Sequence, residues 1–246
     1  MKDNFSTQSG GYAQFRPNYP DALIDFLVAL SPKHETAWDC GTGNGQIAAK
    51  LSEHYETVFA TDISADQIAK ATQRPNIHYQ VESAEQTTFE AHVFDLITVA
   101  QAIHWFDFER FYSEVRRTAK AEGVLAVIGY ALLEIEGKVG ELVNDFYIQT
   151  LQGYWDQERH FIDERYETIP FPFQEMAAPD FSNCYDWTLE QLTGYLETWS
   201  AVQHFIRRNG YNPVTLLAKD LEKQWEPTTT KVVNFPILLR LGKING

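Results

Sequence analysis

A glycine-rich segment between a predicted strand and a predicted helix constrains this chain more than any other feature. Thr36 to Asp39 predicts a short strand, and Gln46 to Leu51 predicts the helix that follows. The residues between them complete a D-x-G-x-G-x-G pattern, Asp39-Cys40-Gly41-Thr42-Gly43-Asn44-Gly45. Because glycine has no Cβ, such a backbone can turn sharply and lie close against a bound molecule. The pattern predicts a loop that binds a ligand at the carboxyl end of the strand.

A carboxylate after the next predicted strand indicates what kind of ligand this loop binds. Asp62 follows the strand Thr57 to Thr61 and stands nineteen residues after Gly43. A carboxylate at that place can accept hydrogen bonds from both ribose hydroxyls of an adenosyl group. A nicotinamide-dependent dehydrogenase, the competing interpretation, requires glycine or alanine where this chain has Gln46. Asp39 also disfavours a dinucleotide, because its carboxylate suits an ammonium group and repels a pyrophosphate.

Strands alternate with helix-length segments over the first half of the chain. This alternation predicts parallel pairing with right-handed crossovers. We therefore expect an α/β fold with a Rossmann-like, doubly wound, mostly parallel sheet. The other segments predicted here are helices at Asp21 to Leu30 and Phe108 to Lys120 and strands at Ile77 to Val81, Phe94 to Ala100 and Gly123 to Tyr130.

The second half of the chain is richer in long helical segments with many aromatic residues. We expect residues 131–230 to form a mostly helical cap inserted into a single domain of residues 1–246, with residues 1–20 as an N-terminal lid. Pro236 lies inside a late strand and predicts an edge position or a bulge there. The helices predicted here are Leu142 to Trp155, Leu189 to Ser200 and Pro213 to Trp225, and the strands are Asn183 to Trp187 and Lys231 to Leu241.

Composition and charge narrow the classes of partner. The 246 residues carry a net charge of −14, which repels nucleic-acid backbones and anionic membrane surfaces, although plain solubility explains the same balance. The chain has no apolar run of membrane-spanning length and no apolar stretch near Met1 typical of a signal peptide, so we expect a cytoplasmic protein. Its two cysteines, Cys40 and Cys184, predict reduced thiols. Whether the protein is a monomer or a homodimer stays open.

The glycine loop and Asp62 resemble those of class I S-adenosylmethionine-dependent methyltransferases, and the ordered motifs cover residues 36–130. Three further segments resemble the trans-aconitate methyltransferase-like group: residues 12–20 (YAQFRPNYP), 101–106 (QAIHWF) and 198–200 (TWS). One position departs from the family, because Gln67 stands where an apolar adenine contact is usual.

The resemblance implies S-adenosylmethionine as the cofactor and a cofactor site assembled from successive loops. Near the methionine portion it implies Asp39, Gly41, Gly43 and Asn44. Near the ribose and adenine it implies Asp62, Ile63, Ala84 and Glu85, and it adds Gln101 after the fourth strand, at the carboxyl end of the sheet. Tyr12 and Arg16 of the predicted lid are further cofactor candidates, and Arg16 could also clamp an acidic acceptor. Packing of this segment against the sheet is the alternative.

Candidates for the chemistry follow the fourth strand. His104 could remove a proton from the acceptor, and the face of Trp105 could lie beside a sulfonium. Ordinary packing roles are the alternative for both, because methyl transfer can proceed by alignment alone. For substrate binding the candidates are Tyr19, Trp199, His204 and Arg207, although an aromatic stripe at helical spacing is more often core.

These observations together predict methyl transfer to a small-molecule acceptor, and Arg16 favours a small organic acid carboxylate. A non-catalytic protein that binds an adenosyl ligand is the alternative from another class. No metal is expected, because the histidines are scattered and no H-E-x-x-H spacing occurs. Asp95 begins the fourth strand, away from the ligand loops, and is predicted to be structural.

Overall fold

A mixed eight-stranded sheet forms the centre of the protein in this computed structural model, which describes residues 17–31 and 33–244. The main path of the sheet has the order β3-β2-β1-β4-β5-β8-β6, and β7 pairs with β8 beside that path. Strands β1 to β5 run parallel, whereas β8 is antiparallel to its neighbours β5, β6 and β7. The strands are β1 (Thr36–Cys40), β2 (Thr57–Asp62), β3 (Ile77–Val81), β4 (Phe94–Ala100), β5 (Ala119–Tyr130), β6 (Gln174–Met176), β7 (Ser182–Trp187) and β8 (Lys231–Lys243).

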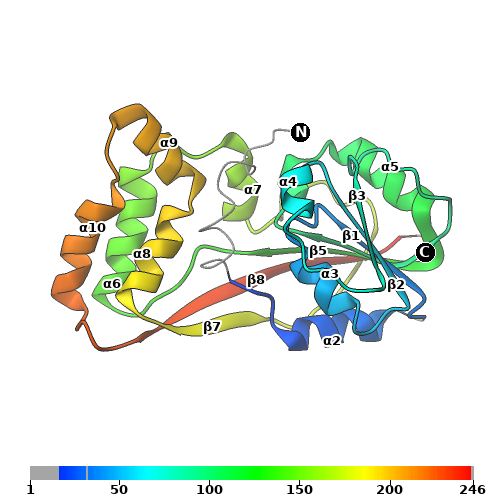
Figure 1. The fold of residues 1–246 in the computed structure, drawn as a ribbon, viewed down its shortest axis with the longest axis horizontal. Helices are drawn as coiled ribbons and strands as arrows, with labels where there is room; N and C mark the ends of the chain where they lie inside the picture. The colour runs from blue at the N-terminus through cyan, green and yellow to red at the C-terminus, as the bar shows by residue number, and fades with distance from the viewer. Residues whose placement is uncertain (1–16, 32, 245–246) are drawn as a thin grey trace.

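Two apolar clusters cover the two faces of the parallel part of the sheet, and this confirms the expected Rossmann-like α/β fold. On one face, α2 buries its stripe of Leu23, Ile24, Leu27 and Val28. On the other face, α5 packs into an aromatic cluster around Trp38. The helices of this lobe, on the right of Figure 1, are α2 (Asp21–Leu30), α3 (Gln46–Leu51), α4 (Ala65–Ile68) and α5 (Phe108–Thr118).

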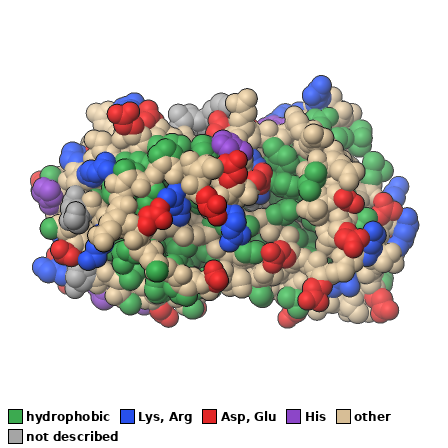
Figure 2. Space-filling view, turned by 180° about the vertical axis from the view of Figure 1, so that it is seen from behind, with side chains coloured by type: hydrophobic (Ala, Val, Ile, Leu, Met, Phe, Trp, Pro, Cys, Tyr) green, Lys and Arg blue, Asp and Glu red, His purple; other side chains and the backbone are tan. Residues whose placement is uncertain are grey.

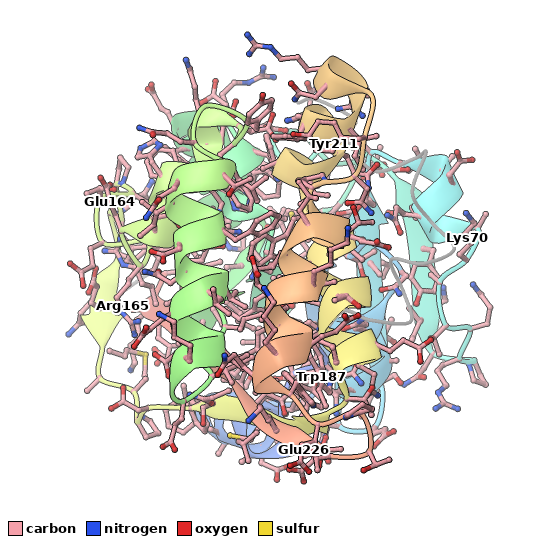
Figure 3. All side chains as sticks on the ribbon, turned by 90° about the vertical axis from the view of Figure 1, so that its left-hand side faces the viewer. Lys70, Glu164, Arg165, Trp187, Tyr211 and Glu226 are labelled. Atoms are coloured by element: carbon pink, nitrogen blue, oxygen red, sulfur yellow. The ribbon has the colours of Figure 1, made fainter. Side chains whose placement is uncertain are left out.

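Four helices form a second lobe at the opposite end of the molecule from α5 (Figure 1). Within it α10 contacts both α6 and α8, and Figure 3 looks onto this lobe with Tyr211 near the end of α9 and Trp187 at the base. These helices are α6 (Lys138–Asp145), α8 (Leu189–Glu197), α9 (Ser200–Asn209) and α10 (Val214–Leu221). All four come from residues 131–230, but that range also supplies β6 and β7.

The long strand β8 joins the two lobes. Its carboxyl-terminal half pairs with β5 and β6, and its amino-terminal half pairs with β7. Pro236 lies where the partner changes, because the β5 register ends at Ile237 and Pro236 is paired with Ser182 of β7. Pro236 has no N–H group to donate, but its carbonyl accepts the Ala131 N–H at 2.9 Å, so the chain stays paired at this changeover.

Short irregular helices connect the lobes. The helix predicted from Leu142 to Trp155 ends earlier, because α6 passes into a single π-helical turn, η2 (Phe146–Thr150). The 3-10 helix η1 (Ile103–Trp105) follows β4 and contacts η3 (Gln157–Arg159), which continues into α7 (His160–Asp163). A last 3-10 turn, η4 (Glu222–Gln224), follows α10.

Candidate functional site

The glycine loop adopts backbone angles that glycine takes up more readily than other residues. Gly41, Gly43 and Gly45 have φ angles of +67°, +55° and +80°, in the left-handed region that side chains disfavour. A Cβ on Gly41 would lie 2.6 Å from the Cβ of Ala102, whereas a Cβ on Gly43 would meet nothing within 4 Å. The loop therefore packs tightly against the segment after β4 at Gly41 and faces open space at Gly43.

Asp39 holds this loop together from inside the sheet. Its carboxylate is buried and accepts hydrogen bonds from the Thr42 hydroxyl (2.5 Å), the Ala48 N–H (3.0 Å) and the Thr98 hydroxyl (3.0 Å). Burial raises its pKa to about 6, against the opposing effect of these hydrogen bonds, and the charge of Asp62 adds to the rise. A cationic group nearby would lower that pKa and favour the charged form.

Asp62 ends β2 beside the same loop. One carboxylate oxygen accepts the Gly43 N–H at 2.9 Å, and the other accepts the Ser64 N–H at 2.8 Å. Ser64 in turn caps α4 by accepting the Gln67 N–H. The carboxylate therefore joins two loops from neighbouring strands and remains only half buried, so that a ligand can still reach it.

The segment after β4 forms the opposite wall. Gln101 has a φ of +53°, which is strained for a residue with a side chain. Its N–H donates to the Ile128 carbonyl (2.9 Å) and its side-chain amide donates to the Tyr130 carbonyl (3.1 Å), so β5 holds it in this conformation. This turn brings Trp105 and Phe106 toward the glycine loop, and both line a cavity together with that loop.

A cavity of about 150 Å³ lies at the carboxyl ends of β1, β2 and β4. Three carboxylates line it, those of Asp39, Asp62 and Glu82, and its described lining contains no lysine, arginine or histidine. This set of groups fits an adenosyl ligand that carries a sulfonium and an ammonium group, and it is unfavourable for a pyrophosphate. The described lining residues are Pro17, Tyr19, Asp39, Gly41, Thr42, Gly43, Asn44, Gln46, Ile47, Asp62, Ile63, Ser64, Gln67, Glu82, Ala84, Ala100, Gln101, Ala102, Trp105, Phe106 and Tyr130.

Most predicted cofactor residues with described positions lie in this lining; Glu85 does not. Its carboxylate accepts the Asp107 N–H at 3.1 Å and also contacts the Ser83 hydroxyl. Tyr19 lines the cavity, with its ring centroid 6.4 Å from that of Tyr130. Tyr12 and Arg16 lie outside the described residues.

The histidine candidate lies behind the cavity wall. His104 is 7% exposed and is not among the lining residues. Its ring stacks on that of Tyr166 at a centroid distance of 6.2 Å, and its Nδ1 lies 3.5 Å from the Tyr166 hydroxyl. The adjacent Trp105 reaches the cavity instead.

The other substrate candidates lie in the second lobe and do not line the cavity. Trp199 is buried among aromatic rings that include Trp155 and Tyr195. His204 is bonded through Nδ1 to the Tyr154 carbonyl at 2.8 Å, and Arg207 is exposed on α9.

Sequence reasoning missed several lining residues. Glu82 follows β3 as directly as Asp62 ends β2, so its position carried the same signal. Tyr130 ends β5 at the same edge, and Gln67 lines the cavity from α4. Asp95 accepts the N–H groups of Glu35 and Thr36 at the opposite edge, in keeping with a structural role.

Two further features concern metal binding and membrane insertion. In residues 17–31 and 33–244, no group of three or more His, Cys, Asp or Glu side chains is arranged to hold a metal ion. Every helix in that part of the chain is too short or too polar to cross a membrane. On the face shown in Figure 2, acidic and basic side chains are interspersed, without a broad basic surface.

Comparisons with known proteins agree with this geometry. Residues 38–127 match the sequence model of the family described as the methyltransferase domain. A Dictyostelium discoideum protein named as a methyltransferase is 30% identical over 98% of this chain and 95% of its own length. A Saccharomyces cerevisiae protein whose name specifies an S-adenosylmethionine-dependent methyltransferase is 20% identical over 85% of this chain and 84% of its own.

A solved structure extends the similarity to the whole fold. The structure of a protein titled as a type II methyltransferase, from Anaeromyxobacter dehalogenans, superposes with a TM-score of 0.88 at 38% identity. The match covers 94% of this chain and 98% of the other, so it includes the helical lobe as well as the sheet. With its glycine loop and strand-end carboxylates, the chain belongs to the class I S-adenosylmethionine-dependent methyltransferases.

Proposed function

We propose that this enzyme methylates a small-molecule acceptor, a small organic acid, held between the strand ends and the helical lobe. The observation that carries the cofactor part is the cavity at the glycine loop, with three carboxylates and no described cation in its lining. S-adenosylmethionine, when bound, supplies an electrophilic methyl group on a positively charged sulfur. The acidic lining would stabilise that charge and repel phosphate-bearing competitors.

The proposed roles of the chain's own residues follow from their places around the cavity. Asp62 would accept hydrogen bonds from ribose hydroxyls, and Asp39 would lie near the ammonium group. Gly43 would let the backbone approach the ligand, because space beside it is open. Trp105 and Phe106 would exclude water and align the acceptor, which supplies much of the rate in such a displacement.

His104 is the candidate base, and in that role it would reach the acceptor only when Trp105, which lines the cavity beside it, moves aside. Its buried ring is held by Tyr166, so its orientation is fixed before an acceptor arrives. A carboxylate acceptor needs no base, and in that case His104 serves as packing.

We also propose that residues 1–20 form a lid. Pro17 and Tyr19 line the cavity, so the chain enters the described part of the structure at the rim of the site. Proteolytic cleavage before Tyr19 is expected to slow when S-adenosylhomocysteine is added, and deletion of residues 1–19 should abolish turnover while the sheet stays folded. Cleavage indifferent to ligand, with turnover retained after deletion, contradicts the lid.

Calorimetric titration tests the cofactor assignment directly. S-adenosylhomocysteine should bind, and NADH should not, because the loop spacing and the acidic lining disfavour a pyrophosphate. Release of S-adenosylhomocysteine from S-adenosylmethionine is then measured with a panel of short carboxylic acids, with amines and phenols as comparison acceptors. Binding without turnover on any class of acceptor would leave only an adenosyl-binding protein.

A further inference from the structure

One partly buried arginine in the helical lobe has terminal nitrogens that no described residue uses. Arg159 ends η3, with its guanidinium carbon 5.0 Å from the Trp155 ring centroid and 5.5 Å from that of Tyr147. Its Nε donates to the Tyr147 hydroxyl (3.0 Å) and to Asp163 (3.4 Å). Neither Nη1 nor Nη2 donates a hydrogen bond to any residue that the structure describes.

Arg240 shows what a structural arginine looks like in the same protein. Apart from Arg159, it is the one described arginine that is not classed as exposed. Its Nη1 donates to the carbonyls of Tyr166 (2.9 Å) and Ile169 (2.7 Å), and its Nη2 contacts the Glu175 carboxylate. Guanidinium groups removed from water normally satisfy their donors in this way. Arg159 differs, because its forked pair of terminal donors meets no described residue and is open to water or to a ligand.

The ion pair between Arg159 and Asp163 does not involve the terminal nitrogens of the guanidinium. Asp163 is 45% exposed and meets the guanidinium only through Nε, so water screens the pair. The Arg159 side chain is 23% exposed, which gives a small ligand access to it. The two aromatic rings fix the plane of the guanidinium and restrict its motion. A planar oxyanion, above all a carboxylate, is the ligand that matches such a fork.

Arg159 lies beside the wall of the cofactor cavity. Helix η3 contacts η1, and Trp105 of η1 lines that cavity. Burial raises the pKa of Tyr166, and the Arg159 charge opposes that rise, so this charge acts close to the ring that stacks on His104. The cavity itself holds Asp39, Asp62 and Glu82 and would repel an anionic acceptor. An anion placed next to it needs a separate counter-charge.

We propose that Arg159 is the anion-binding residue of the acceptor site and takes a carboxylate of the acceptor through its two terminal nitrogens. The inference rests on the proposed methyl transfer to a small organic acid, and it places the recognition of that acid in the helical lobe. A purely structural Arg159, held by cation–π contacts with Tyr147 and Trp155, is the alternative.

Calorimetric titration with succinate, glutarate and butyrate, with and without saturating S-adenosylhomocysteine, tests this assignment. At least one of the acids should bind saturably to the wild-type protein. Arg159→Gln should weaken that binding at least tenfold, and Arg159→Lys should weaken it less, because lysine keeps the charge without the fork. Arg208→Gln is the matched control, since it removes the charge of another exposed arginine, on α9, and it should bind the acid like the wild type.

Several outcomes overturn the inference. No saturable binding of the acids to the loaded wild-type protein does so, and so does unchanged affinity in Arg159→Gln. If Arg159→Gln does not fold by circular dichroism, Arg159→Lys decides, and wild-type affinity in that variant rejects the fork. Titration of S-adenosylhomocysteine into the wild-type protein is independent of Arg159. Its failure would reject cofactor binding and with it the proposed function. Its success with no carboxylate binding would reject this inference and the acid acceptor, and would leave methyl transfer to another acceptor.

Discussion

The edge of the sheet and the helical lobe use their side chains in opposite ways. At the edge, short loops after separate strands bring Asp39, Asp62 and Glu82 around one cavity. In the lobe, Trp199 packs against Trp155 and Tyr195, whose ring centroids lie 5.5 and 5.9 Å from its own. At the edge, polar side chains line a cavity, whereas in the lobe aromatic rings pack closely against each other. Arg159, which lies against two of the aromatic rings, is an exception, because its terminal nitrogens donate no hydrogen bond to a described residue.

The largest expected effect is the loss of turnover in His104→Ala, a substitution between the two regions. If His104 takes a proton from the acceptor, turnover should fall about a hundredfold, the usual scale for a general base, while S-adenosylhomocysteine affinity is unchanged. Turnover is measured with the acceptor found by the panel, and affinity by calorimetry. His78→Ala, at an exposed position on β3, is the control. Unaltered turnover would assign His104 to the packing of Tyr166.

At the edge itself, Asp62→Ala should weaken S-adenosylhomocysteine binding about ten- to a hundredfold. The reason is the loss of charge-assisted hydrogen bonds worth about 1.5 to 3 kcal/mol. Asp66→Ala removes an exposed carboxylate from the nearby helix α4 and should bind like the wild type. Thermal unfolding of both variants separates a binding effect from loss of the bonds to Gly43 and Ser64. Equal affinities in the two variants would contradict the ribose assignment.

The buried carboxylate of Asp39 should give the edge a pH-dependent stability. Burial raises its pKa to about 6 from the ordinary value of 3.8, so the folded state binds the proton more tightly than the unfolded state. This contribution to the free energy of unfolding is fully present below pH 3.8 and is lost as pH rises through about 6.

Asp39→Asn removes this titration. Relative to the wild type, the variant should be more stable at pH 7 than at pH 4.5, and the difference in the free energy of unfolding should be on the order of 2 kcal/mol. Urea unfolding of both proteins at the two pH values measures the difference. The same stability difference at both pH values would show that Asp39 is not the titrating group.

Glycines with similar backbone angles make the smallest contrast. Gly41 at the edge and Gly210, which caps the end of α9 in the lobe, have φ angles of +67° and +78°, but only at Gly41 would a Cβ collide with a neighbour, Ala102. Gly41→Ala should therefore lose about 1 to 2 kcal/mol more stability than Gly210→Ala, because overpacking adds to the strain of a positive φ. Urea denaturation provides the comparison. Equal losses would mean that the segment after β4 yields to the extra methyl group.

Local sequence signals predicted the edge of the sheet well. The glycines at 41 and 43 take the conformation that their spacing required, and Asp62 ends its strand beside them. Glu82 was within reach of the same argument, since it follows β3 directly. Parallel strands bring their carboxyl ends to one edge, so residues placed after successive strands must lie near each other.

The lobe shows where such reasoning stops. Helical spacing placed Trp199, His204 and Arg207 on a common face, yet the structure buries Trp199, bonds His204 to Tyr154 and exposes Arg207. Periodicity reports which residues share a face and says nothing of what that face packs against. The change of α6 into a π-helical turn at Phe146 likewise has no local signal in the sequence.

The sequence by itself determined the α/β class, the glycine loop and the carboxylate that ends β2 beside it, because each depends on residues close together along the chain. The tertiary structure alone decided that Trp105 reaches the cavity while His104 lies behind it, and that the terminal nitrogens of Arg159, near η1, bond to none of the described residues. These placements depend on how segments more than fifty residues apart pack together, as in the contact between His104 and Tyr166. Pairings over such distances are set by the shape of the whole core, which no local pattern encodes.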